Sequence, residues 1–551
     1  MLPRYLIIKI FNYLANDKTH FSGFKKFITR LMLVSKEWKQ ICQEKLDCTI
    51  YKNVRDQDTY TRVSSISDKK GMNLELNLNS KTISSYLDPN DALETVIESI
   101  VIKDLSLISH IKPSPSLKTI NLTIRTRNLA QEIENLETLL NDQVIESISK
   151  VVIDLISEKY DMILDLSQLT WLTKINELVI NGLTGRDCRI ENFIPSLINL
   201  ESLVLNHVVL NRADQLKDLL VQSTSLRCLF YKNVIIKSGM GVLDVISGIS
   251  ASTSLEQVTI SNQTLIPLDS VVNCLNSNRV LKELTVNTNS NADKKVIENS
   301  TLQIYNGIGS IYSLWRVTSN LISVNVDSNQ STKEIQYYHS NQCQNLTFRA
   351  QQFANISKLF DMGILPKLTY LHLKIDSKLP ATNAQVPAPS QSSVTQSLTE
   401  FLGLHQNLCD LKIDFRIPFD NLISIIKCVS AVSKLVVNVN GWSINSFIDS
   451  LLSNNSLQMF TVNSITLNNT QRETVNIFYQ EISRLLEGNT RISHLCLEPP
   501  HDNSKVSQET IDTFRQAIQN NCQNLTNLYI IRSESPQKPI IQILDQYLIN
   551  H

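Results

Sequence analysis

Glycine is scarce in this sequence, with 13 glycines among 551 residues. Soluble proteins usually contain about 7% glycine, so the chain has little material for the glycine-rich loops that cradle phosphate groups. A surplus of charge is also lacking, because 52 Lys and Arg balance 52 Asp and Glu. Non-specific affinity for nucleic acid comes mainly from Lys and Arg side chains that displace counterions. We therefore expect no nucleic acid among the partners of this protein.

Paired cysteines and long apolar runs are missing too. The ten cysteines are scattered and none lies in a CxxC pair, which argues against a disulfide framework. No apolar run reaches the roughly 20 residues that a membrane-spanning helix needs. The apolar N-terminus is not followed by a small-residue cleavage site. We expect a protein of the cytoplasm, the nucleus or both, without a membrane partner.

Motifs of known chemistry are absent from the sequence. HExxH, P-loop and GxSxG patterns do not occur. His494 and Cys496 are two residues apart and would share one face of a strand, but a zinc site normally needs three or four ligands. The sequence thus predicts no metal, no cofactor and no catalytic residue, and we expect that the chain is not an enzyme.

One apolar pattern recurs along the chain: an apolar residue, two variable residues, an apolar residue, one variable residue and an apolar residue. The middle apolar residues of the clearest copies are Leu203, Leu229, Val258, Leu284, Val324, Leu371, Leu411, Leu435, Phe460, Leu495 and Leu528. Weaker copies are centred on Ile100, Ile120, Val151 and Leu178. Neighbouring copies are mostly about two dozen residues apart; Leu178 and Leu203, for example, are separated by 25. Each copy predicts a short strand.

Helical patterns lie between these strands. Ile444, Phe447, Ile448, Leu451 and Leu452 fall on one face of a helix. Similar stripes occur at Leu216/Leu219/Leu220, Leu422/Ile425/Ile426 and Val475/Phe478/Ile482/Leu485. Neither a strand nor a helix of this kind can bury its apolar side alone, so neighbouring units must stack.

From about Ile97 onward the sequence resembles the leucine-rich-repeat superfamily, especially its longer, helix-containing class. The resemblance implies an α/β solenoid with parallel strands on the concave face and helices on the convex face. The asparagine of that family, three positions after the last strand residue, is matched by Asn289 and Asn329 but by few other copies. An irregular α/β protein is the alternative.

The first fifty residues do not follow the repeat. They show three short helical patterns, with Leu2-Pro3, Ile10-Phe11-x-Tyr13-Leu14 and Leu33-Val34-Ser35-Lys36-x-Trp38 in order. This order resembles the F-box, although the stretch between Leu14 and Leu33 is longer than in the usual motif. The resemblance implies contacts to a Skp-family adaptor, or core positions beneath them, for Leu2, Pro3, Ile7, Ile10, Phe11, Leu14, Val34 and Trp38. An ordinary helical cap of the solenoid is the alternative.

The two resemblances divide the chain. We predict an F-box-like module at 1–50, a connecting segment and N-terminal cap at 51–95, a solenoid at 96–535 with loop insertions near 287–300 and 377–396, and a C-terminal cap at 536–551. The function they imply is a substrate-recognition subunit of an SCF-type cullin–RING ubiquitin ligase. A leucine-rich scaffold or inhibitor without a ligase link is the alternative.

The variable residues of each strand pattern would point into the concave surface. Large side chains at such positions are candidate contacts for a client protein, since aromatic anchors dominate many interfaces. The candidates are Phe230, Lys232, Tyr370, His372 and Tyr529. The alternative is that they are scattered surface side chains, which are common.

Overall fold

The computed structural model describes residues 52–54, 74–78, 97–103, 117–124 and 148–156, and then residues 162–547 with gaps. The gaps are 169–171, 173, 185–186, 193–196, 198, 238–240, 262–264, 290–294, 308–310, 328–331, 351–355, 360–362, 376–390, 441–442, 467–474, 490, 498–504, 522–523 and 531–537. The predicted F-box-like module at 1–50 therefore lies outside the described residues. The chain divides into unit 1, Met1–Asp293 with Asn306–Ile308, and unit 2, Lys294–Tyr305 with Gly309–His551.

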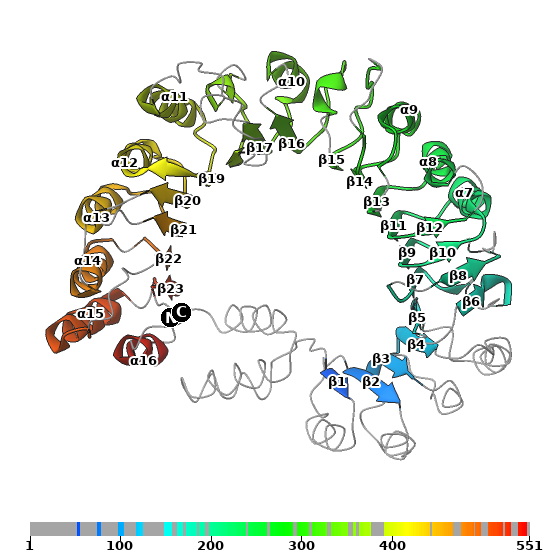
Figure 1. The fold of residues 1–551 in the computed structure, drawn as a ribbon, viewed down its shortest axis with the longest axis horizontal. Coiled ribbons are helices and arrows are strands. Elements are labelled where there is room, and N and C mark those ends of the chain that lie inside the picture. Colours follow the sequence, from blue (N-terminus) through cyan, green and yellow to red (C-terminus); the bar gives the residue numbers. More distant parts are fainter. Residues whose placement is uncertain are drawn as a thin grey trace, which may run out of the picture. The chain divides into compact units, whose positions relative to one another are not determined.

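Unit 1 has a parallel sheet in which each strand pairs with the next one (Figure 1). Its strands are β1 (Lys52–Val54), β2 (Leu74–Leu78), β3 (Ile97–Ile102), β4 (Thr119–Ile124), β5 (Lys150–Leu155), β7 (Glu177–Asn181), β9 (Ser202–Asn206), β11 (Cys228–Lys232), β13 (Gln257–Ser261) and β14 (Glu283–Val286). The middle residues of the sequence pattern stand in register, so that Leu178 pairs with Leu203 and Leu203 with Leu229. All three are buried. The predicted strands of this unit, β3 to β14 of this sheet, are confirmed. β1 and β2 were not predicted and lie within 51–95, where a connecting segment and N-terminal cap was expected.

A second parallel sheet accompanies the main sheet in unit 1. It consists of β6 (Met162–Asp165), β8 (Cys188–Glu191), β10 (Val209–Leu210) and β12 (Ile235–Ile236). The sequence analysis did not predict these strands, which are too short to show a period. The η4 turn (Leu166–Gln168) follows β6, and the helices α7 (Ala213–Gln222), α8 (Val242–Ala251) and α9 (Leu268–Ser277) lie on the outer side of the unit (Figure 1).

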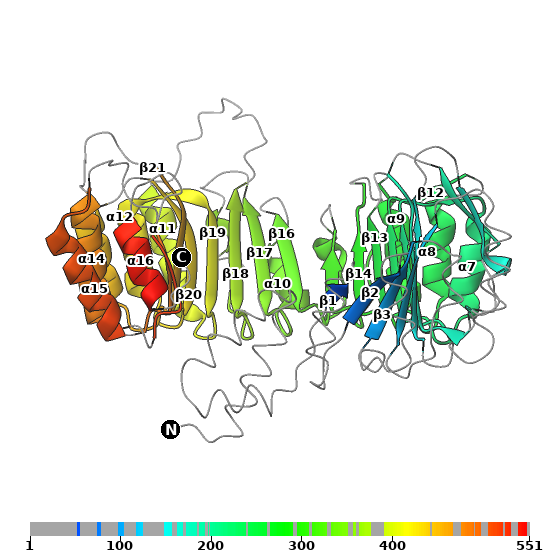
Figure 2. The same cartoon turned by 90° about the horizontal axis from the view of Figure 1, so that it is seen from below.

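Unit 2 repeats the same plan, and Figure 2 shows several of its strands side by side. Its strands are β15 (Ile304–Asn306), β16 (Ser323–Asp327), β17 (Asn345–Ala350), β18 (Tyr370–Ile375), β19 (Asp410–Pro418), β20 (Lys434–Asn440), β21 (Met459–Thr466), β22 (His494–Cys496) and β23 (Asn527–Tyr529). From β16 onward, each of these strands pairs in parallel with the one before it. The predicted strands around Val324 and beyond are confirmed as well.

The helices of unit 2 cover the outer face of its strands (Figure 1). They are η6 (Tyr312–Leu314), α10 (Thr332–His339), α11 (Gln391–Leu404), α12 (Phe419–Cys428), α13 (Ile444–Ser453), α14 (Val475–Gly488), α15 (Gln508–Asn521) and α16 (Lys538–Gln546). The apolar stripes predicted for α12, α13 and α14 face the core. Each unit is thus an α/β leucine-rich-repeat solenoid, with strands on its concave side and helices on its convex side.

The structure describes only parts of the two expected insertions and of the expected C-terminal cap. Of the insertion expected near 287–300, residues 290–294 are not described, and Ile297 forms a β-bridge with Trp315. Of that near 377–396, residues 376–390 are not described and the remainder begins α11. In the segment 536–551, α16 packs beside α15 and buries Ile540 and Leu544.

A buried aromatic cluster fills the first part of unit 2. Trp315 and Tyr312 stack with ring centroids 6.4 Å apart, and the His339 ring meets both edge-on. The carbonyl oxygen of Tyr312 can only accept, so Nε2 of His339 donates to it over 2.9 Å. Because burial favours the neutral imidazole, its Nδ1 accepts from the Ser319 hydroxyl, 2.5 Å away.

Burial lowers the pKa of His339 to about 4, against which the hydrogen bond to the Tyr312 carbonyl acts only weakly. The unfolded chain therefore binds more protons than the folded chain between pH 4 and 6.5, and unit 2 loses stability as the pH falls through this window. We expect a slope of at most about 1.4 kcal/mol per pH unit from this residue. Urea unfolding of wild type and His339→Gln across the window measures it. Equal slopes in the two proteins would contradict the assignment.

Candidate interaction surfaces

The outward-facing side chains of unit 1 form columns across the strands. In each strand the buried residues alternate with half-buried ones that face the concave side. The middle outward positions of four neighbouring strands are Val152, Val179, Val204 and Phe230, which stand in register. We call these four residues the apolar column. They form a continuous apolar stripe on an otherwise polar surface.

Polar side chains flank the apolar column and are paired with each other. On one side, the Lys150 amine lies 2.7 Å from the Glu177 carboxylate. On the other, the Asn181 amide donates to Asp154 and the Asn206 amide donates to Asn181, both over 2.8 Å. A partner that covers the column therefore meets few unpaired charges, and the desolvation cost of binding stays low.

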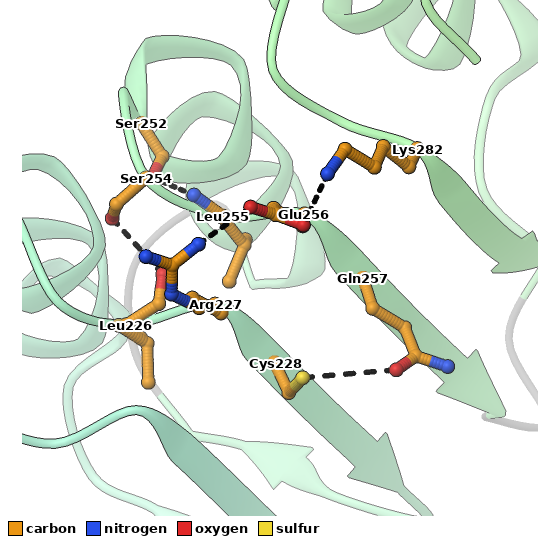
Figure 3. Close-up of polar contacts among 9 residues, drawn as sticks. All are labelled: Leu226, Arg227, Cys228, Ser252, Ser254, Leu255, Glu256, Gln257 and Lys282. Carbon is orange, nitrogen blue, oxygen red and sulfur yellow. Dashed lines mark hydrogen bonds and ion pairs between the residues drawn. The ribbon is translucent and has the colours of Figure 1, made fainter.

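A row of charged residues lies at the start of the strands in unit 1 (Figure 3). The Glu256 carboxylate is 2.7 Å from the Arg227 guanidinium and 2.6 Å from the Lys282 amine. The hydrogen bond from Lys282 and the charges of both cations lower the pKa of Glu256. Beside this row, burial raises the pKa of the Cys228 thiol, and the charge of Glu256 adds to the effect. Cys228 is therefore a neutral thiol and not an activated nucleophile.

The concave strands of unit 2 carry a different set of side chains. His372 on β18 lies with Nε2 2.5 Å from Oδ2 of Asp414 on β19. The Lys412 amine is 3.3 Å from Oδ1 of Asp414, and the Lys374 amine is 4.0 Å from Oδ2 of Asp414. Burial alone would raise the pKa of Asp414, but the hydrogen bonds from His372 and Lys412 and the charge of Lys412 outweigh it, and the pKa is lowered.

The client-contact candidates divide between the two units. Phe230 and Lys232 lie on β11 of unit 1, half-buried and exposed respectively. Tyr370 is half-buried on β18 of unit 2, and Tyr529 at the end of β23 is 42% exposed. His372 differs from the expectation of a surface side chain, since only 8% of it is exposed. The buried His372 ring forms a hydrogen bond with the Asp414 carboxylate.

Sequence reasoning missed the valines of the apolar column. Their signal was present, because Val152, Val179 and Val204 occupy the same variable position of three successive copies. The side chains chosen as client-contact candidates were large or charged, so the valines were not among them. Register across the sheet, which the sequence does not show, joins them to Phe230.

His494 and Cys496 were considered as metal ligands. Both face outward on β22, and the His494 ring lies 5.6 Å from that of Tyr529. Within the described part of the chain, no group of three or more His, Cys, Asp or Glu could hold a metal ion. None of the described helices is long and apolar enough to cross a membrane.

No protein-family model and no curated protein matches the chain. Several solved structures of leucine-rich-repeat proteins are similar to it. An internalin of Listeria monocytogenes has 14% identity, covering 75% of this chain and 92% of its own, with a TM-score of 0.30. The mouse RP105/MD-1 complex has 12% identity, covering 88% and 92%, with a TM-score of 0.40. The TLR13–ssRNA13 complex has 11% identity, covering 84% and 77%, with a TM-score of 0.36.

Proposed function

We propose that this protein recognises a client protein through its concave strands and presents it as the substrate-recognition subunit of an SCF-type ubiquitin ligase. The observation that carries the recognition step is the apolar column, Val152, Val179, Val204 and Phe230, bordered by paired polar residues. An apolar centre inside a polar rim is the usual anatomy of a protein–protein interface.

The apolar column consists of one large side chain, Phe230, and three smaller valine side chains. Phe230 is the aromatic member, and an aromatic side chain supplies much of the binding energy of an interface when a partner desolvates it. The three valines continue the surface at the spacing of neighbouring strands, about 4.8 Å. A partner helix that places one apolar residue per turn, about 5.4 Å apart, fits this spacing.

The ligase role depends on the F-box-like resemblance of residues 1–50, with Pro3 and Trp38 among the motif residues. In this proposal the segment binds a Skp-family adaptor and through it the cullin complex. The repeats hold the client near the transferring subunit, so that proximity accelerates ubiquitin transfer. All bond chemistry then belongs to other subunits.

A two-arm purification tests the proposal with the full chain. We expect wild type to co-purify a Skp-family adaptor together with a client, identified by affinity mass spectrometry. Pro3→Ala/Trp38→Ala removes motif residues and is expected to lose the adaptor but keep the client. Val204→Glu places a charge in the apolar column and is expected to lose the client at least tenfold while keeping the adaptor, since an unpaired charge in an apolar interface costs several kcal/mol.

Val221→Glu is the matched control for the client arm, since Val221 is 41% exposed on α7 of the same unit but lies off the strands. It should leave both partners bound. If wild type brings down no adaptor while Val204→Glu still loses the client, the alternative function is correct: a leucine-rich-repeat scaffold or inhibitor without a ligase link. If Val204→Glu and Val221→Glu behave alike, the apolar column is not the client surface.

A further inference from the structure

The concave strands β17–β20 of unit 2 carry an excess of positive charge. Among their described outward-facing residues, two are acidic, Asp410 and Asp414, and five are basic. The basic residues, which we call the basic face, are Arg349, Lys374, Lys412, Arg416 and Lys434. With His372 neutral, as burial favours, three positive charges remain unbalanced on four neighbouring strands.

The two carboxylates cannot neutralise the basic face. Asp410 is taken by Lys434, whose amine is 2.9 Å from one of its oxygens. Asp414 accepts a hydrogen bond from the neutral His372. Its single charge is shared between Lys412 and Lys374, and the second of these is 4.0 Å away. The positive charge of this face is therefore only partly compensated.

Two arginines of the basic face have no ionic partner among the described residues. Arg349 on β17 and Arg416 on β19 are both exposed. Neither has a hydrogen bond or ion pair with any residue in the described part of the chain. Arg349 stands in register with Lys374, so the cations continue from one strand to the next. Guanidinium groups in this state are ready to pair with carboxylates in a bidentate way.

We propose that the basic face binds an Asp/Glu-rich segment of the client protein. This inference rests on the proposed protein-recognition function and names the chemistry of the partner. Neighbouring parallel strands are about 4.8 Å apart, so the basic face extends about 14 Å across the sheet. An extended peptide covers that distance with four to five residues at about 3.3 Å each. Three carboxylates in such a stretch would balance the excess charge.

A protein segment fits this face better than nucleic acid does. Surfaces for single-stranded nucleic acid combine cations with aromatic rings on which bases stack. Here the aromatic residue beside the cations, Tyr370, is half-buried with its ring turned toward His372. Asp410 and Asp414 within the face would also repel a continuous phosphate backbone, whereas a peptide can place its carboxylates on the cations alone.

The test measures binding of a fluorescein-labelled decapeptide with five Asp and Glu residues to the full chain by fluorescence anisotropy. We expect saturable binding that weakens as salt is raised from 50 to about 300 mM, since the attraction is electrostatic. A peptide with Asn and Gln in place of Asp and Glu should bind at least tenfold more weakly. Arg349→Glu/Arg416→Glu should weaken binding of the acidic peptide at least tenfold.

Lys427→Glu is the charge-matched control, because Lys427 is exposed on α12 of the same unit and off the strands; less than a twofold change is expected. Lys374→Gln supplies a second, milder reduction of charge if the double variant is unfolded. Absence of saturable binding, equal loss in the control, or tighter binding of a single-stranded RNA or phosphopeptide of equal charge overturns the inference. None of these outcomes alters adaptor co-purification, so failure here is distinct from failure of the ligase proposal.

Discussion

Asn454→Ala is expected to lower the free energy of unfolding of unit 2 by about 3 kcal/mol, because several buried backbone groups lose their partner at once. Asn454 lies in the turn between α13 and β21 and is 7% exposed. Its amide donates to the carbonyl oxygens of Ile426 at 2.6 Å and Val429 at 3.0 Å in the preceding repeat. Its side-chain oxygen accepts from the backbone N–H groups of Ser456 and Leu457, both at 2.9 Å.

Asn455→Ala is the control, since it makes the same chemical change one residue further on at an exposed side chain. It should change the free energy of unfolding by less than about 0.5 kcal/mol. Urea denaturation of both variants, followed by circular dichroism, provides the comparison. A loss below about 1 kcal/mol for Asn454→Ala, or equal losses in both variants, would show that the repeats do not depend on this residue.

The same asparagine recurs at the turn before the strand in other repeats. Asn278 and Asn489 also donate to carbonyl oxygens of the preceding repeat and accept N–H groups two or three residues ahead. The sequence analysis sought the asparagine of the family after the strand and found few copies there. In this chain the recurring asparagine stands three residues before the first apolar residue of the strand pattern, so the pattern was present but was sought in the wrong place.

Some of the N-x-S/T triplets in the sequence lie in these turns, where the Ser or Thr hydroxyl is hydrogen-bonded to the asparagine side chain. In Asn299-Ser300-Thr301 the hydroxyl of Thr301 donates to the side-chain oxygen of Asn299 over 3.2 Å, and Ser456 does the same for Asn454 over 3.0 Å. Both asparagines are buried. The triplets at these positions therefore reflect the geometry of a turn between helix and strand.

The strands could be predicted where the three apolar positions are filled by large aliphatic residues. Besides β1, β2 and the strands of the second sheet, β17 and β15 were missed because their patterns are altered. Ahead of β17 the first apolar position is Cys343, followed by Leu346 and Phe348, and β15 has Tyr305 between Leu302 and Gly307. Cys343 and Tyr305 are as buried as leucine would be. A strand therefore forms wherever a side chain fills the buried position, even when that side chain is not aliphatic.

The turns after the strands show how a chain with little glycine folds. Gly182, His207 and Asn233 directly follow β7, β9 and β11 at equivalent places, and their N–H groups donate to the next strand. His207 and Asn233 adopt positive φ values of 52° and 50°. A Cβ on Gly182 would stand 2.1 Å from the His207 carbonyl oxygen. Glycine stands at the turn where another backbone segment comes too close for a Cβ, whereas His207 and Asn233 adopt the left-handed conformation in the other two turns.

Only part of each candidate surface could be predicted from the sequence. The alternation along each strand indicated which residues face outward, and it placed Phe230, Lys232 and Tyr370 on that side, where the structure has them. Pairing across strands is not visible in one strand. It creates the apolar column and the basic face, and it buries His372 against Asp414.

Trp315→Ala is expected to lower the free energy of unfolding of unit 2 by about 4 kcal/mol, since it leaves a large cavity in the core. The side chain is fully buried, stacks on Tyr312 and meets His339 edge-on. Its indole N–H donates to the Asn299 carbonyl oxygen over 2.8 Å, and that acceptor would lose its partner in the variant. The lost partner adds to the cost of the cavity.

Tyr337→Ala is the control for this variant, because Tyr337 is an aromatic residue of α10 in the same unit but is 73% exposed. It should cost less than about 0.5 kcal/mol. Hydrogen exchange read by mass spectrometry assigns the effect to a unit. Trp315→Ala should accelerate exchange in β16 and β17, whose ladder borders the cluster, and leave β9 and β11 of unit 1 unchanged. Equal acceleration in both units would mean that the two arrays unfold as one, whereas protection retained in β16 would mean that the cluster does not hold this part of unit 2 together.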